Sequence, residues 1–467
     1  MRILTVAAEL APLAKTGGLA DAVAGLTRAL ARRGHAVRVL LPRYGDAAAA
    51  GGTALPTQGA HPAPFRYAEL PADGGPRVYC LELSEPPATG DIYSGDERDG
   101  ARYIELSAAA AALPAAAGWQ PDLVHCHDWH AALVPVLARR ITEKARAPCI
   151  LTLHNVGYQG WFPPGLVERS TLLRLDELVE TGGTVVNFLR EGIRAADYLT
   201  TVSPTYAHEI QTPAFGMGLE DLLAARAGVL TGILNGVDYE TWSPESDPHL
   251  PEPFGAHDLA PKARLKQTLC AALGLAGGDA PLVGVVTRLV PQKGIDLLAD
   301  ALPELLATTP AAFALLGSGD PALSERLRGF AREHPARFSF THGYDETLAH
   351  RILAGSDLVA VPSRYEPCGL TQLYALRYGT VPVVRATGGL ADSVSHFDPA
   401  SGTGTGSVFR DADVGGLLWG LRTALGWYDD RPGAWARVVA NAMACDFSWE
   451  HQVREYEALY ARVLATS

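Results

Sequence analysis

The sequence predicts an α/β protein with two domains, each built on a parallel sheet. Apolar, β-branched runs alternate with helical patterns along most of the chain. The alternation stops between Trp242 and Pro261, in a proline-rich polar stretch, and then begins again. A similar phrase, Thr-Gly-Gly-Leu-Ala-Asp, follows an apolar run near both ends, at Thr16 and at Thr387. We therefore expect two Rossmann-like, doubly wound domains that face each other across a deep cleft.

The domain boundaries follow from the same pattern. We expect a first domain over residues 1–243, a linker over 244–261, a second domain over 262–445 and a C-terminal helix over 446–467. A chain of 467 residues is long enough for each domain to bury its own core. The repeated phrase is short, so it indicates similar local design and does not prove gene duplication.

Composition narrows the class of protein. Hydrophobic residues make up 48% and charged residues 19% of the chain, as in globular proteins. The net charge of −12 gives no reason to expect a nucleic acid or an anionic membrane as partner.

Six cysteines lie far apart, which favours reduced thiols. The opening MRILTVAAEL is a poor signal peptide, and the apolar stretch AAAAALPAAAGW is too short to span a bilayer. We expect a cytoplasmic protein.

The first domain opens with a strand, a loop and a helix. RILTVAA is a strand pattern and ELAPLAKTGG a loop; the helix then places Leu19, Val23, Leu26 and Leu30 on one stripe. Gly34 is a typical helix end. The further strands expected in this domain lie in HAVRVLLP, PDLVHCHDWH, APCILTLHNVGYQG, ADYLTTVSP and GILNGVD.

The second domain repeats this arrangement. Each of its apolar runs is followed by a loop and a helical pattern. The expected strands lie in APLVGVVTRL, AAFALLGSGD, RFSFTHGY, SDLVAVPS and TVPVVRATGG.

The first candidate site is the loop Lys15-Thr16-Gly17-Gly18, between a strand and a helix. Glycines let backbone N–H groups approach a phosphate, and a helix N-terminus carries about half a positive charge. Lys15 adds a full charge. A tight turn that merely uses glycine is the alternative, but the lysine and the position after the first strand favour phosphate binding.

The second domain offers two more such loops. Arg288 and Lys293 follow a strand and precede a helix, which suits a diphosphate, although a solvated turn explains them equally well. Further on, Glu366 precedes Gly369-Leu370-Thr371 at the head of a helix. Backbone N–H groups and the Thr371 hydroxyl suit phosphate oxygens, so we expect the nearby carboxylate to face a sugar instead.

The segment HCHDWH contains side chains of metal-ligand types. On a strand, His125 and His127 share a face while Asp128 points away, and no further Cys/His cluster completes a ligand set. We therefore expect no metal. The sequence has one Asp-x-Asp, at Asp411 and Asp413, outside the candidate loops.

Other polar residues directly follow strands. His154-Asn155 is one such pair, with a buried structural histidine as the alternative, and Asn235 and Asp238 lie in another loop. Tyr344 ends a strand and would stack on a base or simply cap the sheet.

Taken together, KTGGLAD, HDWH, LHNVGYQG, the Arg288/Lys293 loop and EPCGLTQLYALRYG followed by TGGLAD resemble bacterial glycogen synthases. These enzymes are related to plant starch synthases, and the resemblance covers essentially the whole chain. It implies a GT-B fold and retaining transfer of glucose from ADP-glucose to the non-reducing end of an α-1,4-glucan such as glycogen. It also implies no metal or organic cofactor, and a last helix that packs back on the first domain.

The resemblance assigns roles to particular residues. Glu366, His154 and Asp128 would hold the glucose, with Arg288 and Lys293 neutralising the diphosphate. ADP-glucose would further contact Lys15, Gly17, Gly18, Asn235, Tyr344, Cys368, Gly369, Leu370 and Thr371, while Glu9 and Tyr93 would meet the acceptor. The second Thr-Gly-Gly phrase lacks a lysine and would contact sugar or acceptor.

One position departs from the pattern of retaining GT-B enzymes. Many carry a second glutamate eight residues after the first, where this chain has Tyr374. Bacterial glycogen synthases lack it too, so no carboxylate pair is expected to do acid–base work. A UDP-glucose-dependent transferase of the same fold, or a non-catalytic glucan- or nucleotide-binding module, stays as an alternative, and the sequence does not give the oligomeric state.

Overall fold

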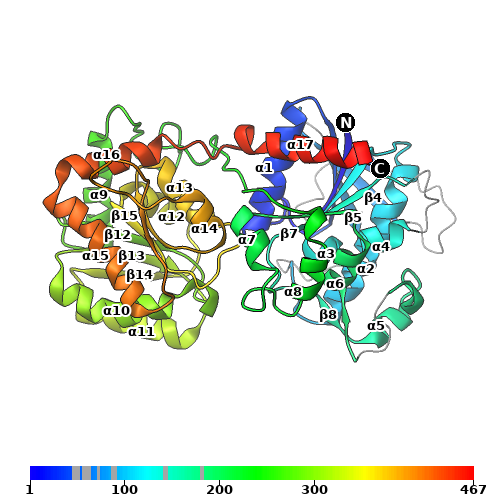
Figure 1. Cartoon of the computed structure of the whole chain (residues 1–467), viewed down its shortest axis with the longest axis horizontal. Helices are drawn as coiled ribbons and strands as arrows, with labels where there is room; N and C mark the ends of the chain where they lie inside the picture. Colours follow the sequence, from blue (N-terminus) through cyan, green and yellow to red (C-terminus); the bar gives the residue numbers. More distant parts are fainter. Residues whose placement is uncertain are drawn as a thin grey trace. The chain divides into compact units, whose positions relative to one another are not determined.

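The computed structural model describes residues 1–44, 53–54, 65–70, 74–85, 92–139, 146–178 and 184–466 (Figure 1). It contains two compact units. The first comprises Met1–Gly236 together with Trp449–Ser467, and the second comprises Val237–Ser448. The sequence-based boundaries, at residues 243 and 445, lie close to these.

The first unit is built on a mostly parallel sheet. Among the described residues its strand order is β11-β10-β7-β6-β1-β2-β5-β4-β3, and only the pairs β5–β4 and β4–β3 are antiparallel. A separate antiparallel pair joins β8 to β9. The strands are β1 (Arg2–Val6), β2 (Ala36–Pro42), β3 (Thr53–Ala54), β4 (Arg66–Leu70), β5 (Arg77–Glu82), β6 (Leu123–His127), β7 (Cys149–Leu153), β8 (Trp161–Phe162), β9 (Val186–Asn187), β10 (Tyr198–Thr201) and β11 (Leu230–Gly232).

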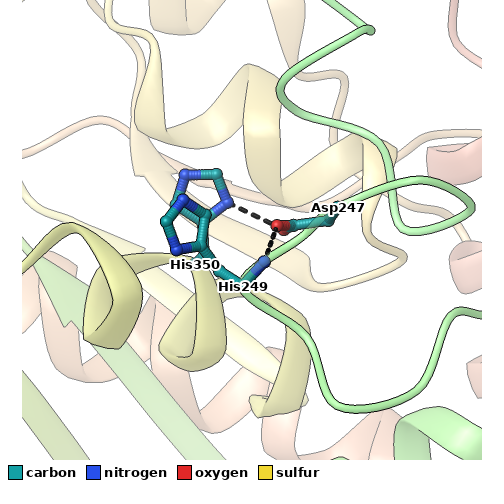
Figure 2. A group of neighbouring side chains, drawn as sticks. All are labelled: Asp247, His249 and His350. Atoms are coloured by element: carbon teal, nitrogen blue, oxygen red, sulfur yellow. Dashed lines mark hydrogen bonds and ion pairs between the residues drawn. The ribbon is translucent and has the colours of Figure 1, made fainter.

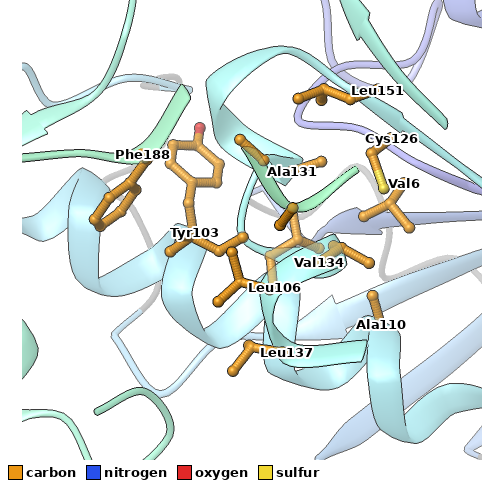
Figure 3. Close-up of a cluster of buried hydrophobic side chains, with 14 of the residues drawn as sticks. Val6, Tyr103, Leu106, Ala110, Cys126, Ala131, Val134, Leu137, Leu151 and Phe188 are labelled. Atoms are coloured by element: carbon orange, nitrogen blue, oxygen red, sulfur yellow. The ribbon is translucent and has the colours of Figure 1, made fainter. Parts of the chain in front are cut away.

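Helices of this unit pack on the sheet and enclose its core. Tyr103 and Leu106 of α2 belong to one buried cluster with Val6, Cys126 and Leu151 from the central strands (Figure 3). The helices are α1 (Gly18–Arg32), α2 (Glu97–Ala116), α3 (Asp128–Ala131), α4 (Val134–Ala138), α5 (Pro164–Arg169), η3 (Leu175–Glu177), α6 (Phe188–Ala195), α7 (Pro204–Glu209), α8 (Glu220–Ala225), η4 (Ala227–Val229) and α17 (Trp449–Thr466).

Helix α1 forms as its sequence predicts. Val23, Leu26 and Leu30 are buried on one stripe, and Leu19 is half-buried. Asp21 lies in the first turn, where a negative charge favours the helix dipole. Gly34 follows the helix with φ of +85°, a conformation that glycine adopts without strain.

The last helix, α17, lies beside α1 in the first unit (Figure 1). The Tyr460 hydroxyl bonds Nδ1 of the buried His125 at 2.7 Å, and Arg33 pairs with Glu457 at 2.7 Å. The indole of Trp449 fills the space beside Gly25 of α1. The C-terminal segment is therefore part of the core of the unit that the N-terminus begins.

The second unit contains a wholly parallel sheet with strand order β14-β13-β12-β15-β16-β17. The strands are β12 (Leu282–Val286), β13 (Ala312–Gly317), β14 (Phe338–His342), β15 (Leu358–Val361), β16 (Val381–Arg385) and β17 (Ser407–Phe409). The helices are α9 (Ala260–Leu273), η5 (Pro291–Lys293), α10 (Ile295–Thr308), α11 (Pro321–Glu333), α12 (Glu346–Gly355), α13 (Thr371–Arg377), α14 (Gly388–Ser393), α15 (Val414–Asp430) and α16 (Pro432–Met443).

The segment 244–261, expected as a linker, is instead packed into the second unit. Leu250 and Phe254 are buried in its core. Just before the segment, the Trp242 indole stacks between His350 and Tyr374, with ring centroids 3.6 and 3.9 Å away. Proline and polar residues prevent a regular helix or strand in this segment. The segment is nevertheless packed, because several of its side chains are buried against the second unit.

Asp247, His249 and His350 form a compact group at this place (Figure 2). Among the described residues, no other group of three or more ligand-type side chains brings its ligand atoms within 4.8 Å of one another. The Asp247 carboxylate is already used: Oδ2 accepts the Tyr378 hydroxyl and Nδ1–H of His350 at 2.7 Å, and Oδ1 accepts the His249 N–H at 2.8 Å. These bonds attach the segment 244–261, which the sequence predicted as a linker, to the second unit.

Each sheet has a point where the strand order reverses. In the first unit β2 and β6 lie on opposite sides of β1, and in the second unit β13 and β15 lie on opposite sides of β12. Ligands of doubly wound sheets bind beyond the carboxyl ends of the strands at this point. The structure has all six cysteines as free thiols, and no helix among the described residues is long and apolar enough to cross a bilayer.

Candidate functional site

In the first unit, the loops after β1 and β6 leave the sheet at its reversal point. Glu9, in the loop after β1, is buried, and its Oε2 accepts the Thr16 N–H at 2.7 Å and the Gly17 N–H at 3.2 Å. Its Oε1 accepts the Tyr93 hydroxyl. Glu9 therefore holds the glycine loop in shape, a contact that sequence reasoning did not predict.

Lys15 is on the exposed side of the same loop. Its Nζ lies 2.9 Å from Asp21 Oδ1, in the first turn of α1. Gly17 is the residue before α1, with φ of −157°, and a Cβ there would meet nothing within 4 Å. Gly17 is therefore needed neither for an unusual backbone conformation nor for close packing within the described chain.

Asp128 stands at the end of β6, where it begins α3 with φ of +57°. A side chain in this left-handed region costs about 1 kcal/mol or more, which the surrounding contacts must offset. Its Oδ1 accepts the His154 N–H at 2.7 Å, so the carboxylate joins the ends of β6 and β7. Burial raises the pKa of Asp128 to about 7.

Four histidines lie on β6, α3 and the loop after β7: the buried His125, His127 and His130, and the half-buried His154. His125 and His127 share a face of β6, as the alternation predicts, with ring centroids 4.3 Å apart. His127 Nδ1 lies 2.9 Å from His154 Nε2. Burial lowers the pKa of His125, His130 and His154 to about 3 and that of His127 well below its usual range. The group is therefore neutral at pH 7.

Two atoms of this cluster lack a hydrogen-bond partner among the described residues. They are His127 Nε2 and His130 Nδ1, both buried. The Asn235 side chain, later in the same unit, is 5% exposed, and its Oδ1 also lacks a partner. Buried polar atoms of this kind are normally satisfied, so these positions suit a polar ligand.

In the second unit, the loops after β12 and β15 meet at the reversal point. Lys293 ends the short helix η5, and its Nζ lies 2.6 Å from Glu366 Oε2 in the loop after β15. The Ser363 hydroxyl donates to the same oxygen at 2.8 Å. Sequence reasoning gave Lys293 and Glu366 separate ligands, but the structure pairs them directly. The Ser363 contact was missed, although Ser363 stands only three residues before the glutamate.

The backbones of these two loops are also joined. The Arg364 N–H donates to the Gln292 carbonyl at 2.8 Å, and Gln292 Nε2 donates to the Tyr365 carbonyl at 3.2 Å. Arg364 pairs with Asp296 of α10 at 2.6 Å. The Lys293–Glu366 pair therefore stands on a rigid frame, while Arg288, on the same β12 loop, is exposed.

The remaining predicted residues of this unit lie beside the pair or beyond β14. Cys368 is buried, Gly369 has φ of +73°, and Leu370 precedes Thr371, the first residue of α13. Tyr344 follows β14 and is 77% exposed, the highest value among the large apolar side chains of the described residues. An aromatic ring with this much exposed surface is a candidate for stacking on a base.

The second glycine phrase also lies at this site. Thr387, Gly388, Gly389 and Leu390 are buried, packed on the loop of Glu366. Ala391 of the phrase is exposed and Asp392 is half-buried, and contact of the phrase with sugar or acceptor stays a prediction.

Comparison with known proteins identifies the family. A family model for the starch synthase catalytic domain matches residues 2–225, and one for group 1 glycosyl transferases matches residues 274–426. A glycogen synthase of Anaeromyxobacter sp. (strain Fw109-5) is 46% identical over 489 residues, covering all of both chains. The chain belongs to the glycogen synthase family. Another member, from Alkalilimnicola ehrlichii, is 45% identical and covers 98% of each chain.

Solved structures place the family among GT-B glycosyltransferases. The catalytic domain of starch synthase IV from Arabidopsis thaliana, bound to ADP and acarbose, is 35% identical, with a TM-score of 0.88 and 99% coverage of both chains. A sucrose-phosphate synthase from Thermosynechococcus elongatus, 21% identical with a TM-score of 0.63, shares the fold. The chain is thus a glycosyltransferase with two Rossmann-like units.

Proposed function

We propose that this enzyme transfers glucose from ADP-glucose to the non-reducing end of an α-1,4-glucan, with retention of the anomeric configuration and release of ADP. The likeness to the starch synthase catalytic domain bound to ADP and acarbose carries this proposal. The full-length relatives named glycogen synthase support it. The free cysteines suit a cytoplasmic setting, where thiols stay reduced.

Departure of ADP leaves negative charge on the diphosphate, and we assign Arg288 and Lys293 to stabilise it. A cation about 4 Å from a charge is worth on the order of 4 kcal/mol at an effective dielectric near 20. Each 1.36 kcal/mol is about tenfold in rate, so even part of this is a large effect. Gly369, Leu370 and Thr371, with Cys368, would bind the phosphates at the start of α13, and Tyr344 would stack on adenine.

Glu366 would stabilise the positive charge that develops on the glucose ring. Because Lys293 and Ser363 already hold its carboxylate, it needs no rearrangement to act, which is the condition for electrostatic catalysis. We propose that the acceptor hydroxyl attacks from the face that the phosphate leaves, with the phosphate taking its proton.

The first unit would contribute the remaining contacts. His154 and Asp128 would bind hydroxyls of the glucose, with Asn235 offering its unpartnered Oδ1. Lys15, Gly17 and Gly18 would approach the donor. Glu9 and Tyr93 would shape this loop and meet the acceptor.

One assay tests the proposal. The full chain is incubated with glycogen and either ADP-glucose or UDP-glucose, and nucleotide release and glucan mass are measured. We expect faster turnover with ADP-glucose, and β-amylase should remove the added glucose as maltose. Faster turnover with UDP-glucose would favour the other donor. Binding of ADP and glycogen without turnover would favour a non-catalytic module.

The variant Glu366→Gln sharpens the assay. It should fold normally and lose most transfer activity, because the amide keeps the shape but not the charge. Glu325→Gln, an exposed glutamate of α11, is the matched control and should keep full activity. Retention of most activity in Glu366→Gln would contradict the role given to the carboxylate.

A further inference from the structure

The second glycine phrase, from Thr387 to Asp392, follows β16 and forms the short helix α14. Its glycines are packed on the Glu366 loop. The Gly389 N–H donates to the Glu366 carbonyl at 3.1 Å and approaches the Pro367 carbonyl at 3.2 Å. The backbone that directly follows the Glu366 side chain is thus held by the phrase.

Only glycine fits at these two positions. A Cβ on Gly388 would lie within 3 Å of the Glu366 carbonyl, and one on Gly389 within 3 Å of the Cys368 backbone. Gly388 also has φ of +43°, in the left-handed region. Any larger residue would push the Glu366 loop away, because backbone atoms cannot swing aside as a flexible side chain can.

A buried polar network locks α14 against the same loop. The Ser393 hydroxyl donates to the Gly389 carbonyl at 2.6 Å and accepts from Gln372 Nε2 at 3.1 Å. Gln372 Nε2 also reaches the Cys368 carbonyl at 3.1 Å. The loop is therefore held by the phrase and, through Gln292, by the turn that carries Lys293.

The first glycine phrase is built differently. A Cβ on Gly17 would meet nothing within 4 Å, and the N–H groups of Thr16 and Gly17 bond the Glu9 carboxylate rather than another backbone. The first glycines of the two phrases, Gly17 and Gly388, therefore differ in what surrounds them. Glycine is required for close packing at Gly388 and Gly389, but not at Gly17.

We propose that Gly388 and Gly389 are positioning residues, which set the place of the Glu366 carboxylate beside Lys293 without touching substrate. The effect on catalysis rests on the proposed function, in which Glu366 acts on the transferred glucose. A misplacement of about 1 Å at a reacting centre costs about 10²-fold in rate.

The central experiment is Gly389→Ala in the full chain. We expect kcat to fall about 10²-fold, and KM for ADP-glucose to rise as well, because the clash displaces the Cys368 backbone in the loop proposed to bind the phosphates. Gly426→Ala is the matched control, because a Cβ at Gly426 of α15 would meet nothing within 4 Å. Unchanged kcat in Gly389→Ala would overturn the proposal.

A double-mutant cycle separates positioning from general damage. If Gly389 acts through Glu366, then Gly389→Ala should cost little further activity in the Glu366→Gln background. If the two substitutions instead lower activity by the product of their separate effects, Gly389 does not act through Glu366. Should Gly389→Ala fail to fold, Ser393→Ala removes the lock on the Gly389 carbonyl without a clash, and the same non-additivity is expected.

A readout independent of turnover distinguishes this proposal from the proposed function. Cys368 is 5% exposed in the loop that Gly389 holds. If the loop is displaced, iodoacetamide should alkylate the Cys368 thiol at least several-fold faster, whatever the donor sugar is. Peptide mass spectrometry measures the alkylation rate. Equal alkylation rates in Gly389→Ala and the unaltered chain would overturn the positioning role even if the enzyme is active.

Discussion

Lys293 Nζ lies 2.6 Å from Glu366 Oε2, on the loops that follow β12 and β15. The exposed fractions of the two side chains are 19% and 6%, so the pair is largely shielded from water. Charge-assisted hydrogen bonds between such groups are about twice as strong as neutral ones. The pair thus joins the cation proposed for the diphosphate to the carboxylate proposed for the sugar.

Removing either cation of this loop should lower kcat, but only the loss of Lys293 should also lower stability. Lys293→Ala and Arg288→Ala should each lower kcat by roughly 10²–10³, because each removes charge stabilisation of the leaving group. Lys293→Ala should also lower the free energy of unfolding by about 1–3 kcal/mol, since Glu366 loses a buried partner. Arg288 is exposed, so its loss should leave stability unchanged. Initial rates and urea unfolding measure both, with the exposed Arg422→Ala as control. A stable Lys293→Ala enzyme with normal kcat would contradict this.

The buried histidines predict how stability depends on pH. Burial lowers the pKa of His125, His130 and His154 to about 3, from an ordinary value near 6.5. Between these values the unfolded chain binds protons that the folded chain does not, so the free energy of unfolding should fall as pH falls from about 6.5 towards 3. His154→Asn should make this slope shallower, and the exposed His257→Asn serves as control. An unchanged slope in His154→Asn would refute the claim that the buried histidines cause this pH dependence.

The contribution of Asp128 to the free energy of unfolding should depend on pH in the opposite direction. Burial raises its pKa to about 7, so between about pH 4 and 7 the folded chain holds a proton that the unfolded chain releases. Its contribution to the free energy of unfolding therefore decreases as pH rises through this range. Asp128→Asn should remove the contribution and raise stability at pH 8 relative to pH 4, compared with the exposed Asp430→Asn. Urea titrations at several pH values check this, and a parallel pH curve for the two variants would count against it.

Trp242 should stabilise the second unit although it lies beside the segment expected as a linker. Trp242→Ala removes stacking on His350 and Tyr374 and should cost about 2–4 kcal/mol, somewhat below the usual range for a fully buried tryptophan. Trp419→Ala, at a tryptophan that is 51% exposed, is the matched control and should cost much less. Denaturation followed by circular dichroism measures both, and equal costs would argue for a loose linker.

Close contact of α1 with α17 predicts an effect of one added methyl group. A Cβ on Gly25 would lie within 3 Å of the Trp449 indole, so Gly25→Ala should destabilise the first unit by about 1–3 kcal/mol. Gly329→Ala, in α11, has open space and should be neutral or stabilising. Thermal melting compares the variants. Increased stability of Gly25→Ala would show that α17 does not pack there.

Local sequence determined the order of strands, loops and helices, and with it most of the candidate site. Polar residues that follow β1, β6, β7, β12 and β15 stand at strand ends because alternation and glycine signals act over a few residues. Sequence also indicated the shared face of His125 and His127, which is a property of one strand. Resemblance to glycogen synthases supplied the family, and the comparisons confirmed it.

Only the tertiary structure decided which distant groups meet. It paired Lys293 with Glu366, gave His125 a partner in Tyr460, and packed Trp242 and Asp247 into a core where the composition predicted a linker. It also packed the second glycine phrase against the Glu366 loop. These outcomes depend on how side chains from separate elements fill shared space, and that complementarity is a property of the packed chain, not of any short stretch of it.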